Sequence, residues 1–168
     1  TPVGSSGSAI KGDIDLPLPN GSSMSFVLVE AGTCLVGSTP SEVGHQPDEA
    51  PATLVDIPYD YYVGIVEVTE EQWVTVMNTT LWEGGFDPDR PARNMDWYAA
   101  SAFALETNSW NGENLVRLPS EVEWECASRA STESRWSFGN SQAELADHAW
   151  YETNSGGVPS KVGQKLPN

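Results

Sequence analysis

The residues best suited to chemistry lie together in "RLPSEVEWECASR", residues 117–129. Three glutamates, two arginines, a cysteine and a tryptophan could form an active site, a metal site or an acidic helix held in place by its arginines. Ser120 follows Pro119 and is a strong helix N-cap, and Glu123 stands at the capping-box position. Glutamates in the first turn and Arg129 in the last turn suit the helix dipole. We therefore interpret the stretch as a structural helix.

The two arginines of this stretch are expected to orient the helix. A guanidinium binds a carboxylate through two parallel hydrogen bonds, so Arg117 and Arg129 are suited to clamp a buried carboxylate. Glu67 and Glu123 are the candidate partners. Trp124 belongs to the same structural set, because its spacing along the helix is that of a side chain facing a core.

Other residue types that could do chemistry lack the spacing that such chemistry needs. The two histidines, His45 and His148, have no cysteine or carboxylate at zinc-site spacing, so we interpret both as ordinary loop residues. No serine nucleophile elbow or phosphate-binding Gly-Lys-Ser motif is present. Glutamate pairs such as residues 70–71 are interpreted as helix-start charges.

The supporting elements follow from periodicity and turn signals. Residues 24–38 contain two β-prone runs around a Gly, which predict a hairpin, and residues 52–69 give two more strands. Thr69 is a helix N-cap with Gln72 at the box position, and an apolar stripe begins at Trp73. A further helix is expected after Asp96, a suitable cap.

Composition divides the chain into an arm and one domain. Residues 1–23 have no aromatic side chain and are rich in Gly, Ser and Pro, so they are expected to form a flexible arm or an extended one that pairs along a neighbour. Residues 24–168 are expected to form the globular domain. Its last part, after residue 130, is loop-like but carries four aromatic side chains, which indicates that it is packed down.

The charge of the chain excludes one class of partner. The sequence has 24 acidic and 8 basic residues and a formal net charge of -16, without the clustered Lys and Arg that nucleic acid requires. No apolar run approaches the ~20 residues of a membrane helix, so direct membrane insertion is not expected. An acidic excess suits a solvated surface, cation binding or docking on a basic protein partner.

Two cysteines and two glycosylation sequons are compatible with an exported chain. Cys34 and Cys126 could close a long loop as a disulfide, although sequence alone does not place their Cα atoms within bonding range. The sequons begin at Asn20 and Asn78. The chain begins with Thr1 rather than Met, so an upstream segment is expected. We expect an extracellular or periplasmic location.

The order of landmarks resembles the N-terminal part of the formylglycine-generating enzyme (sulfatase-modifying factor) family. The runs that carry the resemblance include "FVLVEAGTCLVGS", "MDWYAASAFA", "RLPSEVEWECASR", "WSFGN" and "AWYETNSGGVPSKVGQKLPN". The resemblance implies an α+β fold of the complex C-type-lectin-like kind, with little regular secondary structure. It also implies that the catalytic cysteine pair, which binds copper in this family, belongs to a C-terminal part with no counterpart in these 168 residues.

The same resemblance implies a calcium site in the loop of about residues 149–162. Asp147, Glu152 and Asn154 are the oxygen ligands that this chain offers there. The alternative is a loop closed by hydrogen bonds. No copper is expected on this chain alone.

Three hypotheses for function follow. The first is a non-catalytic, exported binding or structural subunit on a formylglycine-generating-enzyme-like scaffold, which docks on another protein within a larger complex. The second is one part of an oxidoreductase of this type whose catalytic cysteines lie on another segment or chain. The third is a calcium-dependent, lectin-like binder of a glycan or other ligand.

Overall fold

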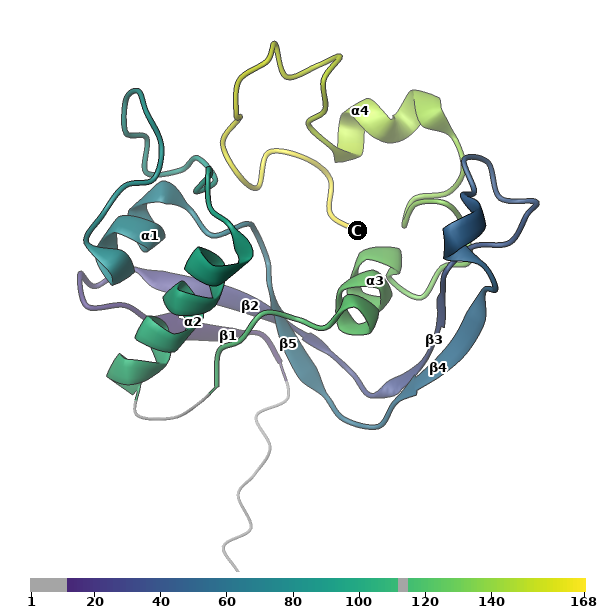
Figure 1. Cartoon of the computed structure of the whole chain (residues 1–168), viewed down its shortest axis with the longest axis horizontal. Coiled ribbons are helices and arrows are strands. Elements are labelled where there is room, and N and C mark those ends of the chain that lie inside the picture. The colour runs from purple at the N-terminus through teal and green to yellow at the C-terminus, as the bar shows by residue number, and fades with distance from the viewer. Residues whose placement is uncertain (1–11, 112–114) are drawn as a thin grey trace, which may run out of the picture.

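The predicted α+β fold, with little regular secondary structure, is confirmed by the computed structural model of the chain, which describes residues 12–111 and 115–168 (Figure 1). One antiparallel sheet has the strand order β1-β2-β5, and a second sheet pairs β3 with β4. The strands are β1 (Ile14–Pro17), β2 (Ser23–Val29), β3 (Gly32–Val36), β4 (Thr53–Ile57) and β5 (Tyr61–Gly64). The α-helices are α1 (Glu70–Met77), α2 (Trp97–Asn111), α3 (Glu121–Arg129) and α4 (Leu145–His148), and short 3-10 helices cover Pro47–Glu49 and Gln142–Glu144.

The hairpin predicted within residues 24–38 is wrong. Strands β2 and β3 follow each other along one side of a bent two-stranded ribbon, and β4 and β5 form its other side. At the bend, residues 30–31 between β2 and β3 lie opposite residues 58–60 between β4 and β5. Pro58 has no N–H for the ladder, and Asp60 Oδ1 instead accepts a hydrogen bond from Ala31 N at 2.8 Å. The glycine signal therefore marks a bend and not a turn.

The arm expected over residues 1–23 belongs to the fold from Ile14 onward. Strand β1 pairs with β2 throughout its length, and Leu18 beyond it is buried in the core. Residues 14–17 thus agree with the extended alternative, an arm that pairs along a neighbour, and the pairing joins them to the domain. The alternation of Ile14, Leu16 and Leu18 is the period of a strand, but a Gly- and Ser-rich context masks it. The part of the arm at residues 1–11 lies outside the described residues.

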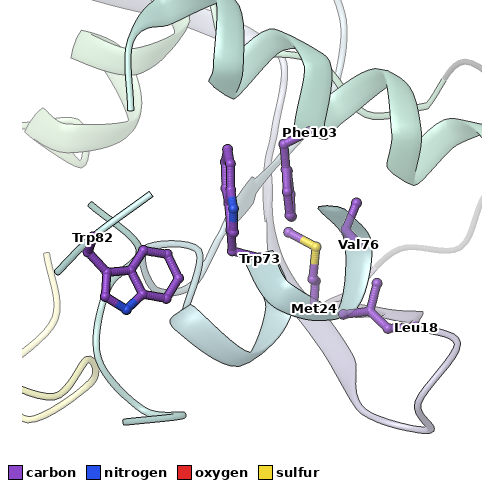
Figure 2. Packing of buried hydrophobic residues seen from close by; sticks show 6 residues of the cluster. All are labelled: Leu18, Met24, Trp73, Val76, Trp82 and Phe103. Carbon is purple, nitrogen blue, oxygen red and sulfur yellow. The ribbon is translucent and has the colours of Figure 1, made fainter. Parts of the chain in front are cut away.

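The main core lies between the three-stranded sheet and helices α1 and α2 (Figure 2). Trp73 of α1 stacks on Phe103 of α2 with ring centroids 5.4 Å apart and an interplanar angle of 10°. The stripe predicted from Trp73 onward is confirmed, since Trp73 and Val76 are buried. Met24 of β2 joins the same cluster, so the sheet and both helices share one apolar interior.

Both capping boxes predicted from the sequence are formed. Thr69 Oγ1 accepts a hydrogen bond from Gln72 N, and Gln72 Oε1 accepts one from Thr69 N at 3.0 Å. Ser120 and Glu123 make the same exchange at the start of α3. Asp96 Oδ1 accepts from the backbone N–H of Ala99 at 2.8 Å and so caps α2.

Candidate functional site: a groove beside α3

Helix α3 lies beside the bent ribbon (Figure 1). Contacts from β3 and from β5, on the two sides of the bend, fix the helix there. Cys126 of α3 forms a disulfide with Cys34 of β3, and their Cα atoms are 5.8 Å apart. Tyr61 of β5 donates its hydroxyl to the backbone carbonyl of Glu123 at 2.8 Å. These ties hold α3 against the ribbon and leave its outer face beside a groove.

The clamp that orients α3 joins Arg117 to Glu123. The carboxylate of Glu123 is 2% exposed, and Arg117 approaches both of its oxygens, with Nη1 2.7 Å from Oε2. Ser120 N also donates to Oε2, at 2.7 Å. The hydrogen bonds from Arg117, aided by those from Ser120 and opposed by burial, hold the pKa of Glu123 down to about 2.

Acid should destabilise the fold through this carboxylate. Because the folded-state pKa of about 2 is below the ordinary 4.5, ionised Glu123 contributes stability above that ordinary value. The contribution, roughly 2–3 kcal/mol, is lost as the pH falls through about 2. Urea unfolding at a series of pH values from about 5 to 2 measures this loss. Arg117→Ala removes the main cause and should flatten the profile; a parallel profile in the variant would contradict this assignment.

Arg129 ties three segments together instead of clamping Glu67. Its guanidinium donates to Gly37 O at 2.7 Å, to Glu125 Oε1 at 2.9 Å and to Ser134 O at 3.2 Å. Glu67 is exposed, and neither arginine takes it as ion-pair partner. The prediction of a buried Glu67 is therefore wrong, because the chain after β5 turns this side chain outward.

A groove of about 940 Å³ opens beside α3. Its walls are the β3–β4 ribbon, the loop 42–51, α3 itself, the turn 135–138 and the C-terminal segment. Five carboxylates and two arginines contribute to the lining, together with aromatic and aliphatic side chains. The volume lies in the upper part of the range for ligand sites.

One wall of the groove is a stack of aromatic and imidazole rings. Trp136 and Phe138 stack with ring centroids 5.4 Å apart, and Phe138 stacks on His148 of α4 at 4.0 Å. Arg135 lies over the Trp136 ring, 4.4 Å from its centre, and the Arg135 guanidinium is also close to Gly44. A Cβ at Gly44 would lie 2.8 Å from this guanidinium, which would have to shift, and the φ of +91° at Gly44 also favours glycine. The stack thus joins α4 to the loop 42–51, and His148 has a packing role that its sequence context did not indicate.

A serine, a histidine and a glutamate meet behind the groove. Ser38 Oγ lies 2.6 Å from His45 Nδ1 and donates to Glu49 Oε2 at 2.6 Å. The hydrogen bond from Ser38 is the main cause that lowers the pKa of Glu49. Because Ser38 is buried and its hydroxyl proton is directed to a carboxylate, this arrangement closes the loop 38–49 and does not present a nucleophile.

Trp124 is not part of the core, and the prediction that it faces the core is wrong. Its side chain is 62% exposed and lines both the groove and a second, mainly apolar cavity of about 410 Å³. That cavity runs along β5 toward α2. The helical period correctly separates the faces of α3, but the buried face is the one carrying Glu123 and Cys126.

The predicted calcium ligands lie in and after α4. Asp147 and Glu152 are exposed, while the amide of Asn154 accepts from Tyr151 N at 2.8 Å and donates to Ala149 O at 2.9 Å. Asn154 therefore closes its own turn. Within residues 12–111 and 115–168, no group of three His, Cys, Asp or Glu side chains is placed to hold a metal ion. Calcium at these residues stays a prediction.

A second ion pair with a buried carboxylate, that of Glu70 with Arg93, was not predicted from the sequence. Glu70 is the first residue of α1 and was expected to be a solvated helix-start charge, but its side chain is 0% exposed. The segment 87–93 folds over this helix end: Glu70 N donates to Arg90 O at 2.8 Å, and Asp87 N donates to Glu70 Oε2 at 2.9 Å. In the sequence, only Arg93, which follows a loop with two prolines, hints at this ion pair, and its position does not identify Glu70 as the partner.

Comparison with protein families matches residues 16–165 to the model of the sulfatase-modifying factor enzyme 1-like domain. The curated chaperone protein LppX of Paenibacillus barcinonensis is 29% identical over 137 residues, which cover 60% of this chain and 47% of LppX. The chain thus spans about half the length of this relative.

No helix in the described residues is both long and apolar enough to cross a membrane.

Two solved structures share the fold. PvdO from Pseudomonas aeruginosa matches with a TM-score of 0.74 and 24% identity, over 87% of this chain and 64% of PvdO. Treponema denticola variable protein 1 matches with a TM-score of 0.78 and 23% identity, over 93% of this chain and 70% of that protein. At these identities the likeness concerns the fold alone.

Proposed function

The chain belongs to the family of sulfatase-modifying factor enzyme 1-like domains, and we propose that it uses this scaffold as a non-catalytic, exported binding or structural subunit that docks on another protein. The observation that carries the proposal is the groove beside α3, a broad concave surface at whose edge the large side chain of Trp124 is exposed. Exposed aromatic side chains beside a cavity are typical anchors of protein interfaces. LppX, a relative, is named a chaperone, which is a class that acts on other proteins.

The cysteines support a structural role and export. The chain has two cysteines, and both are used in the disulfide between β3 and α3. In the described residues neither cysteine is a free thiol, which supports a structural role. Disulfides of this kind form and persist in oxidising compartments, which favours an extracellular or periplasmic location.

Zero-length crosslinking of carboxylates to partner lysines tests the docking proposal. The purified chain is incubated with the exported fraction of its source, crosslinked, and analysed by mass spectrometry. We expect crosslinks from acidic residues around the groove to one recurrent protein. Crosslinks scattered over the whole acidic surface, or none to any protein, would count against a docking subunit.

A second candidate is one part of a formylglycine-generating-type oxidoreductase. The observation that favours it is length, since the chain spans 47% of LppX and 64–70% of the two structures. The intact mass of the native protein discriminates. A mass well above 18.2 kDa, with further cysteines in the additional part, favours the oxidoreductase. Conversion of a peptide thiol to an aldehyde by these 168 residues alone would overturn the non-catalytic proposal.

Calcium-dependent, lectin-like glycan binding is the third candidate and rests on the predicted ligands. If calcium binds at Asp147 and Glu152, adding it to the EDTA-treated protein should raise the unfolding temperature. Glu152→Ala should abolish the rise without disturbing the turn that Asn154 closes, because Glu152 is exposed. An unfolding temperature that does not respond to calcium would leave the hydrogen-bonded loop as the explanation.

A further inference from the structure

We propose that the groove beside α3 binds a basic, extended segment of a partner protein that also carries aliphatic side chains. This inference rests on the proposed docking function and names the site and the chemistry of the partner. The first support is the charge of the lining, in which Glu42, Asp48, Glu49, Glu121 and Glu125 outnumber Arg129 and Arg135.

After Arg129 and Arg135 are counted against the five carboxylates, the lining keeps an excess of three negative charges that a ligand could pair with. Arg129 pairs with Glu125 at 2.9 Å and with Glu42 at 3.9 Å, and it also donates to backbone carbonyls. Arg135 lies between the Trp136 ring and Gly44. By contrast, Asp48 and Glu121 are exposed and take part in no ion pair among the described residues.

Apolar surface lies between these charges. Val43, Trp124 and Leu166 are exposed side chains of the groove, supplied by three separate segments of the chain. A ligand that satisfied only the carboxylates would leave this surface in water, whereas lysine and arginine side chains have aliphatic stems that can cover it. An aromatic ring such as that of Trp124 also attracts cations. Carboxylates beside exposed apolar side chains thus match a basic and aliphatic peptide better than an inorganic cation or an anionic ligand.

Fluorescence anisotropy with two labelled peptides tests the inference on the full chain. One peptide alternates lysine with leucine, and the other alternates glutamate with leucine. We expect the lysine peptide to bind with an affinity that falls as salt is added, and the glutamate peptide not to bind. No binding of the lysine peptide at low salt, or equal binding of both peptides, would overturn the proposal.

Variants separate the groove from general charge attraction. Asp48→Asn combined with Glu121→Gln should weaken binding roughly tenfold, since it removes two exposed charges of the groove. Trp124→Ala should weaken it roughly 30-fold, as expected of an exposed anchor. The charge-matched control, Glu67→Gln with Glu106→Gln, removes two exposed carboxylates that do not line the groove and should change binding less than about twofold. Equal losses in both double variants would overturn the proposal in favour of non-specific attraction.

The same variants distinguish this inference from the docking function. If the full chain still crosslinks to its partner after Asp48→Asn, Glu121→Gln and Trp124→Ala are combined, the groove is not the docking site although docking itself stands. If the peptide binds in the groove but no partner is found, the groove chemistry stands and the docking function fails. Circular dichroism spectra and unfolding midpoints unchanged in each variant confirm that folding is retained.

Discussion

Arg93→Ala should lower the free energy of unfolding by about 3–5 kcal/mol, because it leaves the buried carboxylate of Glu70 without its counter-charge. The Glu70 side chain is 0% exposed. Without Arg93, the described contacts leave its carboxylate one hydrogen bond, from the backbone N–H of Asp87. Arg93 also donates to Glu83 O at 3.2 Å and lies 5.6 Å from the ring centre of Trp82. Urea unfolding of the variant and the wild type at neutral pH measures the difference.

Arg90 provides the matched control for this experiment. It lies in the same loop, is 37% exposed against 24% for Arg93, and pairs with Asp87 at 3.6 Å. Such a surface pair contributes about 0–1 kcal/mol, so Arg90→Ala should be nearly neutral. Arg93→Lys should recover only part of the loss, since an ammonium cannot reproduce the fork that reaches both Glu70 and Glu83. Comparable losses for Arg90→Ala and Arg93→Ala would contradict a special role of the buried pair.

Local features of the fold were predictable because they depend on residues close in sequence. Thr69 with Gln72 and Ser120 with Glu123 specify two helix starts through side chains three residues apart, and both boxes form. The stripe that begins at Trp73 is likewise set by the helical period. Such signals need no knowledge of where the rest of the chain lies.

Features that depend on distant segments were missed or misjudged. Glu70 is buried because the loop at Arg93 folds over it, and a glutamate at a helix start has the same local signature whether it is solvated or covered. Trp124 appeared to face a core because the helical period gives the faces of α3 but does not tell which face is covered. The bend at Pro58 depends on the pairing of β4 with β3, whose partner residues are 17 to 25 positions apart along the chain.

The groove itself could not have been predicted for the same reason. Its wall requires Arg135 to lie against Gly44, and its base requires Arg129 to reach Gly37. These contacts join segments about 90 residues apart, and the intervening sequence carries no signal for them. The acidic composition and the family resemblance favoured a docking subunit, whereas the groove beside α3, where we propose that a partner binds, is seen only in the structure.

Removing the disulfide should destabilise the fold by about 4–5 kcal/mol in the chain-entropy model, because Cys34 and Cys126 are separated by 92 positions. Urea unfolding of Cys34→Ala/Cys126→Ala, and of the reduced wild type as its control, should give similar losses. Thiol labelling of the denatured, unreduced wild type should find no free sulfhydryl. Labelled thiols before reduction would show that the bridge is absent from the protein.

The double variant should nevertheless keep α3 in place, because other ties reach the same helix. Glu125 Oε1 accepts from Gly37 N at 2.9 Å, Arg129 donates to Gly37 O at 2.7 Å, and Tyr61 donates to the Glu123 carbonyl at 2.8 Å. We therefore expect the lysine–leucine peptide to bind the folded double variant within about threefold of wild type, even though the variant unfolds at lower urea. A loss of peptide binding in parallel with stability would mean that the disulfide, and not these hydrogen bonds, shapes the groove.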